Sequence, residues 1–141
     1  PNVTFSTDII VGFPNETEAD FADTLDLVEK VNFEQAYMFL YSKRVGTPAD
    51  TMVGQIPEEV KHQRFNRLKA LVESQIEQKN KTYVGTVQKV LIEGESKTNP
   101  EYLTGRTDSN KVVICQKPKE SIGTVIPLQI VSEHMWYLKG E

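Results

Sequence analysis

The spacing of apolar residues changes once along the chain, near Tyr83. Before this point the pattern is typical of alternating strands and helices, and after it the pattern is typical of short strands alone. A single sheet cannot satisfy both patterns. We therefore expect an α+β chain in three parts, formed by residues 1–56, residues 57–82 and residues 83–141.

The first part reads as a strand, a helix and a second strand. Residues 7–11 are apolar and β-branched, as in a strand that is buried on both faces of a parallel sheet. Thr17 and Asp20 have the spacing of a capping box, and the helix that follows should end near Asn32. Residues 36–41 predict the second strand. Together these elements have about the length of one βαβ unit.

A βαβ unit is not expected to be stable alone, because two parallel strands leave a sheet edge and an apolar face uncovered. A buried strand begins only a few residues after Pro1. We therefore expect the chain to be a piece of a longer protein whose earlier strands complete a sheet or barrel. If the apolar face stays uncovered, the piece is expected to dimerise or to exchange strands.

The second part predicts one long helix that begins at Pro57 and ends near Asn80. Its apolar stripe consists of Val60, Phe65, Leu68, Val72 and Ile76. Its first half also carries the basic residues Lys61, Arg64, Arg67 and Lys69. Because surface lysine and arginine are ordinary on helices, we expect a solvated face here and not an RNA contact.

The third part predicts five short strands, at residues 83–94, 103–107, 111–115, 123–131 and 134–138. Five short strands fit a small closed barrel of the oligonucleotide-binding kind, which leaves no sheet edge. The clearest hairpin is at Asp108-Ser109-Asn110, because Asp and Asn tolerate left-handed backbone. His134, Trp136 and Tyr137 are expected in the core or in the closing strand.

Charge and cysteine content restrict the classes of site. The net charge is −4, but residues 83–141 carry seven basic and seven acidic side chains, so bulk charge argues neither for nor against a nucleic-acid partner. The single cysteine, Cys115, excludes a disulfide or a multi-cysteine metal site within the chain, and we expect it to be a small strand side chain. No apolar run approaches the roughly 20 residues that cross a bilayer, so we expect no membrane association and a cytoplasmic location.

Two loops follow the carboxyl ends of the predicted parallel strands, where ligands gather in such sheets. Residues 12–17 follow the first strand and residues 42–49 follow the second. Glycine lets backbone approach a ligand, and the free amides at the start of a helix attract anions. By themselves these loops indicate a ligand site only weakly, because a Gly-Phe-Pro turn also occurs as plain loop geometry.

The chain resembles the C-terminal part of the radical S-adenosylmethionine methylthiotransferases of the MiaB type in four ordered segments: "TDIIVGFPNETEADFADTL", "FLYSKRVGTPAD", "QIPEEVKHQRFNRL" and "GRTDSNKVV". The resemblance covers essentially the whole chain. It implies that residues 1–56 are the end of a radical SAM (TIM-like) barrel, that residues 57–82 are a linker helix, and that residues 83–141 are a TRAM domain, a small OB-like β-barrel that binds tRNA.

The family implies an enzyme that adds a methylthio group to C2 of N6-isopentenyladenosine beside the tRNA anticodon, using [4Fe-4S] clusters and S-adenosylmethionine. The family's three-cysteine motif is not in this sequence. We therefore expect no catalytic residue, no metal ligand and no bound cofactor in this chain, which should be inactive by itself. Asn15 stands where the family usually has glycine, and both residues tolerate positive φ.

Site residues are expected at both ends of the chain. The residues that the resemblance places near the cofactor or the flipped nucleoside are Gly12, Phe13, Pro14, Glu16, Arg44, Gly46 and Thr47. In the expected barrel, the candidates for RNA contacts are Lys89, Lys97, Tyr102, Arg106, Thr107, Asn110 and Lys111, with Tyr102 as a stacking surface. The alternative for Arg44 is a surface ion pair.

Three alternatives stay open from the sequence. The same chemistry could act on threonylcarbamoyladenosine of tRNA or on an aspartate of a ribosomal protein. The chain could also be a stand-alone RNA-binding module without catalysis. Finally, the barrel could have a structural or protein-binding role.

Overall fold

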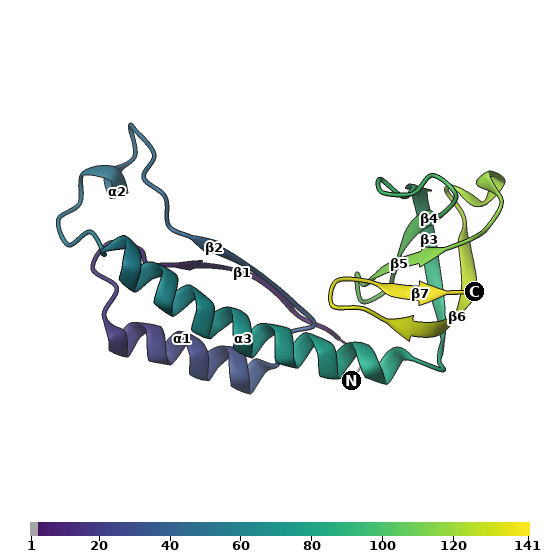
Figure 1. Cartoon of the computed structure of the whole chain (residues 1–141), viewed down its shortest axis with the longest axis horizontal. Coiled ribbons are helices and arrows are strands. Elements are labelled where there is room, and N and C mark those ends of the chain that lie inside the picture. Colours follow the sequence, from purple (N-terminus) through teal and green to yellow (C-terminus); the bar gives the residue numbers. More distant parts are fainter. Residues whose placement is uncertain (1–2) are drawn as a thin grey trace. The chain divides into compact units, whose positions relative to one another are not determined.

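The computed structural model describes residues 3–141, so Pro1 and Asn2 of the expected first part lie outside the described residues. The chain contains two compact units, Phe5–Gln75 and Ile76–Glu141 (Figure 1). The long helix α3 (Glu58–Tyr83) contributes residues to both.

The first unit is a βαβ arrangement with parallel strands. β1 (Ser6–Val11) pairs with β2 (Gln35–Leu40) along their whole length, so that Ser6 lies opposite Gln35 and Val11 opposite Leu40. The helix α1 (Glu18–Val31) connects the two strands, and α2 (Pro48–Thr51) is a single turn after β2. The predicted βαβ unit is confirmed.

Both ends of α1 follow from local side-chain chemistry. The hydroxyl of Thr17 accepts a hydrogen bond from the Asp20 N–H at 3.1 Å, and the Asp20 carboxylate accepts one from the Thr17 N–H at 2.8 Å. This is the predicted capping box. At the other end Asn32 adopts left-handed backbone with φ 51°, as does Asn15 in the turn after β1 with φ 68°. The helix therefore ends at Asn32 as predicted, and Asn15 accommodates the positive φ that was expected of it.

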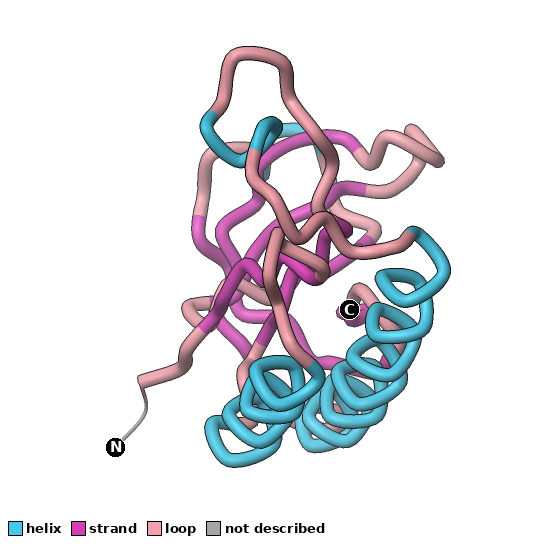
Figure 2. The backbone as a smooth tube through the Cα atoms, turned by 90° about the vertical axis from the view of Figure 1, so that its left-hand side faces the viewer, coloured by secondary structure: helices cyan, strands magenta, loops and turns pink. Residues whose placement is uncertain are grey.

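The strand pair is covered on one face. α1 and α3 lie side by side (Figure 2), and Gln75 Nε2 of α3 donates to the Val28 carbonyl of α1 at 3.2 Å. Val11 is buried, whereas Ile10 is 56% exposed and Phe39 is 52% exposed. The prediction that β1 is buried on both faces is therefore wrong for this chain. Burial alternates along β1 because, among the described residues of this unit, the helices pack on one side only.

The buried stripe of α3 is partly charged. Its buried apolar residues are Leu68, Val72 and Ile76, as predicted. Nearer its N-terminus, however, Lys61 and Arg64 are buried, whereas Val60 and Phe65 are only partly buried. The prediction of a solvated basic face is thus wrong at Lys61 and Arg64, because both find partners within the unit.

The second unit is a closed five-stranded barrel. Its strands are β3 (Val87–Glu95), β4 (Leu103–Thr107), β5 (Val112–Cys115), β6 (Val125–Glu133) and β7 (Leu138–Gly140), with a 3₁₀ turn η1 (Lys119–Ser121) before β6. The order around the barrel is β3-β4-β5-β7-β6, in which β5 and β7 are parallel and the other neighbours are antiparallel. The predicted OB-like barrel, and with it the α+β fold class, is confirmed.

The barrel core is built from alternate strand residues: Val90, Ile92, Leu103, Val113, Cys115, Leu128, Ile130 and Leu138. Cys115 is fully buried, as expected for a small strand side chain, and burial raises the pKa of its thiol. The predicted start of the first barrel strand at Tyr83 is wrong. Tyr83 ends α3, packs against the core, and hydrogen-bonds through its hydroxyl to Ser109 Oγ at 2.8 Å.

The closing strand also lies later than predicted. Residues 134–137 form a turn in which the His134 N–H donates to the Tyr137 carbonyl at 2.9 Å, and β7 begins at Leu138. Trp136 is 47% exposed and Tyr137 is 38% exposed. The expectation that these aromatic residues belong to the core or the closing strand is therefore wrong, because the turn projects them outward.

Gly105 provides a test of how closely β3 and β4 pack. A Cβ at Gly105 would lie 2.5 Å from the Leu91 carbonyl oxygen and 2.7 Å from Val90 Cγ1. We expect Gly105→Ala to lower the free energy of unfolding by about 1–3 kcal/mol through overpacking. Urea denaturation followed by Trp136 fluorescence measures this loss. Gly94→Ala is the matched control, because a Cβ on that β3 glycine meets no atom within 4 Å; equal losses in both variants would contradict the prediction.

Candidate functional site

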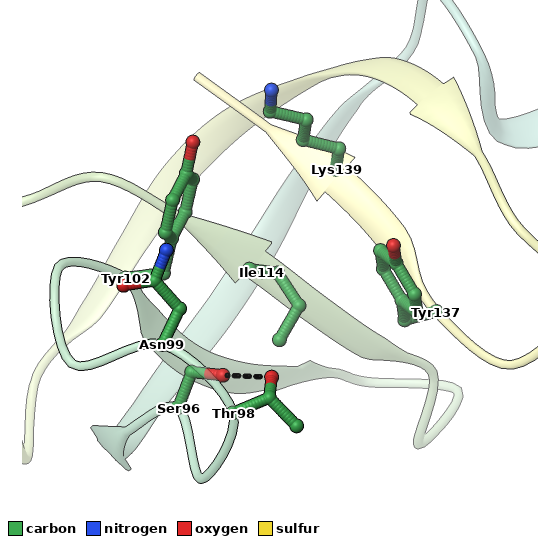
Figure 3. Close-up of a pocket in the computed structure, with 7 residues that line it drawn as sticks. All are labelled: Ser96, Thr98, Asn99, Tyr102, Ile114, Tyr137 and Lys139. Carbon is green, nitrogen blue, oxygen red and sulfur yellow. Dashed lines mark hydrogen bonds between the residues drawn. The ribbon is translucent and has the colours of Figure 1, made fainter.

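A pocket of about 410 Å³ opens on the surface of the barrel (Figure 3). The residues that line it are Ser96, Thr98, Asn99, Tyr102, Ile114, Tyr137 and Lys139. They come from the β3–β4 loop, from β5, from the β6–β7 turn and from β7. None of the seven is acidic. The pocket therefore offers aromatic rings and apolar atoms together with one positive charge.

The β3–β4 loop positions Tyr102 through its own hydrogen bonds. Asn99 Oδ1 accepts from the Glu101 N–H at 3.0 Å, and the Asn99 carbonyl accepts from the Tyr102 N–H at 3.1 Å. The Ser96 N–H donates to the Tyr102 carbonyl at 2.8 Å, which closes the loop. This is turn chemistry that asparagine favours. The Asn99 amide group Nδ2 can donate to a ligand, while Oδ1 is engaged by the loop.

Tyr102 and Tyr137 lie on either side of Ile114 in the pocket (Figure 3). Lys139 Nζ is 5.8 Å from the centroid of the Tyr102 ring, within the range of a cation–π contact. Tyr137 stacks on His134, with 4.4 Å between ring centroids and 17° between ring planes. Each tyrosine is thus oriented by a neighbour while its ring stays partly exposed.

Four of the predicted RNA-binding residues gather at a different place, the β4–β5 hairpin: Arg106, Thr107, Asn110 and Lys111. Arg106 Nη1 donates to Asn110 Oδ1 at 3.1 Å, and Arg106 Nε pairs with Glu93 at 3.3 Å. Thr107 and Lys111 are buried, at 6% and 4% exposure. Asn110 has φ 64°, which confirms the predicted turn. These contacts stabilise the hairpin, and a role in RNA contact stays a prediction.

The other three predicted RNA-binding residues are separate from this hairpin. Tyr102 lines the pocket, and Lys97 lies in the same loop between two lining residues. Lys89 is exposed on β3, opposite Pro127 of β6, and does not line the pocket. The barrel therefore brings only part of the predicted set together.

Of the seven lining residues, the sequence predicts only Tyr102 as a site residue, and it does not predict Ser96, Thr98, Asn99, Ile114, Tyr137 or Lys139. A signal for Tyr137 and Lys139 was present, because side chains alternate across a strand and the buried Leu138 lies between them. That alternation directs both neighbours of Leu138 away from the core. Asn99 carried no comparable signal.

In the first unit, Glu16 holds the corner after β1. Its Oε2 accepts from the Gly12 N–H at 3.1 Å, and Gly12 has φ 82°. The Lys61 side chain fills the space beside Gly12, since a Cβ there would lie 2.3 Å from Lys61 Cγ. Phe13 packs edge-on against Tyr41 with 5.3 Å between ring centroids. The corner is a packed turn that glycine at position 12 makes possible.

Arg64 of α3 completes this corner. Its Nη1 donates to both the carbonyl and the Oε1 of Glu16 at 2.9 Å, and its Nε donates to Glu18 Oε2 at 3.2 Å. The side chains of Arg64 and Glu16 are only 8% and 13% exposed. Arg67 is more exposed and also pairs with Glu18, and its hydrogen bond lowers the pKa of Glu18. The Glu16 carboxylate is therefore engaged within the protein.

The second predicted cofactor loop contains a turn from Arg44 to Thr47. The Thr47 N–H and hydroxyl both donate to the Arg44 carbonyl, at 3.1 and 2.8 Å, and Gly46 has φ 87°. A pocket of about 420 Å³ nearby is lined by Leu40, Tyr41, Ser42, Lys43, Gln55, Ile56, Glu58 and Lys61. None of the seven predicted cofactor residues lines it. The structure thus does not gather them around one pocket.

Residues 3–141 contain no group of three or more His, Cys, Asp or Glu side chains that could hold a metal ion. They also include no helix whose length and apolar character would allow it to cross a membrane.

Comparison with known proteins connects both units to one family. Residues 81–141 match the TRAM domain. The chain is 52% identical over 140 residues to the tRNA-2-methylthio-N(6)-dimethylallyladenosine synthase of Oceanobacillus iheyensis, and 51% identical over 140 residues to that of Acetivibrio thermocellus. Each match includes 99% of this chain. The chain matches the C-terminal region of the MiaB-type methylthiotransferases.

The match covers only part of each relative's length. The chain spans 27% and 29% of those two MiaB-type proteins, and 30% of a third from Finegoldia magna, to which it is 52% identical. The resemblance to the MiaB type and the TRAM domain predicted from the sequence are confirmed.

Arg64 and Arg67 allow the buried and exposed parts of the ion-pair network to be compared. We expect Arg64→Ala to lower the free energy of unfolding by about 3–5 kcal/mol, because it leaves the Glu16 carboxylate buried without its partner. Arg67→Ala should lower the free energy of unfolding much less, because its pair with Glu18 is exposed to solvent. Urea denaturation followed by circular dichroism gives both values, and hydrogen exchange of residues 12–18 localises the change. Similar losses in the two variants would contradict the assignment.

Proposed function

We propose that this chain is the tRNA-binding end of a cytoplasmic enzyme that adds a methylthio group to C2 of N6-isopentenyladenosine next to the anticodon. The relatives are tRNA-2-methylthio-N(6)-dimethylallyladenosine synthases, which supports this substrate. In this proposal residues 1–56 are the end of the radical SAM barrel, residues 57–82 are a linker helix, and residues 83–141 are the TRAM domain that binds the tRNA anticodon region.

The barrel pocket is the observation that supports RNA binding most directly. In OB barrels, oligonucleotides bind on the second and third strands and on the loops that join strands 1 and 2 and strands 4 and 5. The corresponding elements here are β5, the β3–β4 loop and the β6–β7 turn, and all three line the pocket. Aromatic rings stack on unpaired bases, and lysine neutralises phosphate. Tyr102, Tyr137 and Lys139 supply both kinds of group at this place.

The loops of the first unit are proposed to face the cofactor in the whole enzyme. Gly12, Phe13, Pro14, Glu16, Arg44, Gly46 and Thr47 would border S-adenosylmethionine or the flipped nucleoside there. Phe13 is 44% exposed and can contact a ligand, whereas the Glu16 carboxylate is engaged by Gly12 and Arg64. Glu16 therefore suits a role in shaping the corner, and not in offering a free carboxylate.

The chemistry itself is proposed to need more than this chain. When bound, [4Fe-4S] clusters and S-adenosylmethionine supply the radical, the sulfur and the methyl group. Residues 3–141 contain no group of metal-binding side chains, and the relatives are more than three times as long as the match. We place the cluster ligands in that additional length, and we propose that this chain alone is inactive.

RNA binding can be measured on the chain itself. We expect it to bind an anticodon stem-loop that carries isopentenyladenosine, with log Kd changing linearly with log salt concentration. Lys97→Gln should reduce the slope by about 0.7–0.9, the loss of one phosphate contact. Lys30→Gln, an exposed lysine of α1, is the control and should leave the slope unchanged. Fluorescence anisotropy of labelled RNA gives the slopes, and absence of salt-sensitive binding would overturn the proposal.

The exposed face of the strand pair predicts self-association of this chain. Ile10, Tyr37 and Phe39 are 56%, 40% and 52% exposed, and all three lie at alternate positions that share one face of β1 and β2. We expect a dimer at high protein concentration, driven by burial of this face. Phe39→Lys should shift the equilibrium towards the monomer in light scattering after size exclusion. A monomer at every concentration would contradict this expectation.

A further inference from the structure

We infer that the barrel pocket holds one unstacked nucleobase of the bound RNA, stacked on Tyr102 and enclosed by Ile114 and Tyr137. This inference rests on the proposed tRNA binding. It adds the kind of group that enters the pocket and the residues that hold it.

The size and walls of the pocket suit a flat ring. Its volume of about 410 Å³ lies within the roughly 300–1,000 Å³ of small-ligand sites. Tyr102 and Tyr137 stand on either side of Ile114 (Figure 3), so a base that enters would meet a ring and an apolar side chain. The Asn99 turn and the His134 stack hold the two tyrosines in place before any ligand arrives. Such preorganisation reduces the entropy lost on binding.

The charges around the pocket argue for a base and against a phosphate in its interior. Lys139 is the single charged residue of the lining, and its ammonium lies over the Tyr102 ring at 5.8 Å. A phosphate buried among Tyr102, Ile114 and Tyr137 would have one cation to replace its hydration. A stacked base needs no such compensation, and Lys139 can then contact the phosphate or a carbonyl at the rim.

Two side-chain groups of the lining can only donate hydrogen bonds, the Asn99 Nδ2 and the Lys139 ammonium. The Asn99 Oδ1 already accepts from the Glu101 N–H. The hydroxyls of the lining, on Ser96, Thr98, Tyr102 and Tyr137, can adapt as donors or acceptors. The Watson–Crick edge of uracil presents two carbonyl acceptors on either side of one N–H donor, whereas that of adenine presents one ring-nitrogen acceptor beside an amino donor. Two donors in the lining can therefore both be satisfied by uracil, but adenine would leave one of them facing its amino group, so the pocket should prefer uracil.

Anisotropy with two labelled hairpins tests this inference on the full chain. The hairpins share one stem, and their loops consist of uridines in one and adenosines in the other. We expect tighter binding of the uridine loop. Tyr102→Ala and Tyr137→Ala should each weaken it about tenfold with no change in salt slope, while Tyr102→Phe, which keeps the ring, should bind as the unaltered chain does. Trp136→Ala, which removes an exposed aromatic residue of the same turn as Tyr137 that does not line the pocket, is the matched control.

A second measurement does not depend on altered proteins. A 4-thiouridine loop, irradiated with the unaltered chain, should crosslink to peptides that contain residues 96–102 or 134–139, as identified by mass spectrometry. Crosslinks found only elsewhere, or tyrosine variants that fold and bind normally, would overturn the base pocket and leave the proposed tRNA binding intact. Tighter binding of the adenosine loop would overturn the inferred preference of the pocket for uracil. If the unaltered chain shows no salt-sensitive binding, the proposed function itself fails.

Discussion

The barrel depends on the pairing of one very short strand. β7 has three residues, and it bonds to β5 on one side and to β6 on the other. Leu138 and Gly140 face the core, and a Cβ on Gly140 would lie 3.1 Å from the Leu128 Cβ, so the closure leaves little room for a larger residue. Tyr137 and Lys139 must then face outward. The pocket is therefore a consequence of how the barrel closes.

In the first unit a buried ion pair determines the shape of one corner. Buried backbone groups need hydrogen-bond partners, and here Glu16 accepts from the Gly12 N–H while Arg64 donates to the Glu16 carbonyl. An apolar pair of similar volume could fill this space but could not satisfy either backbone group. We interpret the pair as a device that fixes geometry more than one that adds stability. It acts at the carboxyl end of β1, the edge at which ligands of parallel sheets bind.

The features that could be predicted from the sequence have local causes. Thr17 and Asp20 cap a helix three residues apart, and Asn32 and Asn110 supply left-handed backbone where the chain must turn. The buried face of α3 could not be predicted in the same way. Arg64 looks exposed when only its own helix is considered, because its partner Glu16 lies 48 residues away in the sequence.

The candidate site shows the same division between local and distant causes. The sequence predicts Tyr102 as a stacking surface, and Tyr102 lines the pocket. The sequence also predicts Tyr137 in the core or in the closing strand, where the structure does not place it. Only the register of β7 shows that residues 134–137 form a turn. Pockets that are assembled from three separate segments cannot be found by reading any one of them.

The structure also explains how a barrel with balanced charge can present a positive pocket. Glu93 pairs with Arg106 and Glu95 pairs with Lys119, and none of these four residues lines the pocket. Residues 83–141, which have equal numbers of acidic and basic side chains, can therefore present a locally positive, aromatic surface. With few phosphate contacts, stacking would contribute a large share of the binding free energy, and the interaction would depend less on salt than for a basic groove. Such a surface is suited to fixing the position of one unpaired nucleotide, while the rest of a longer enzyme supplies further affinity.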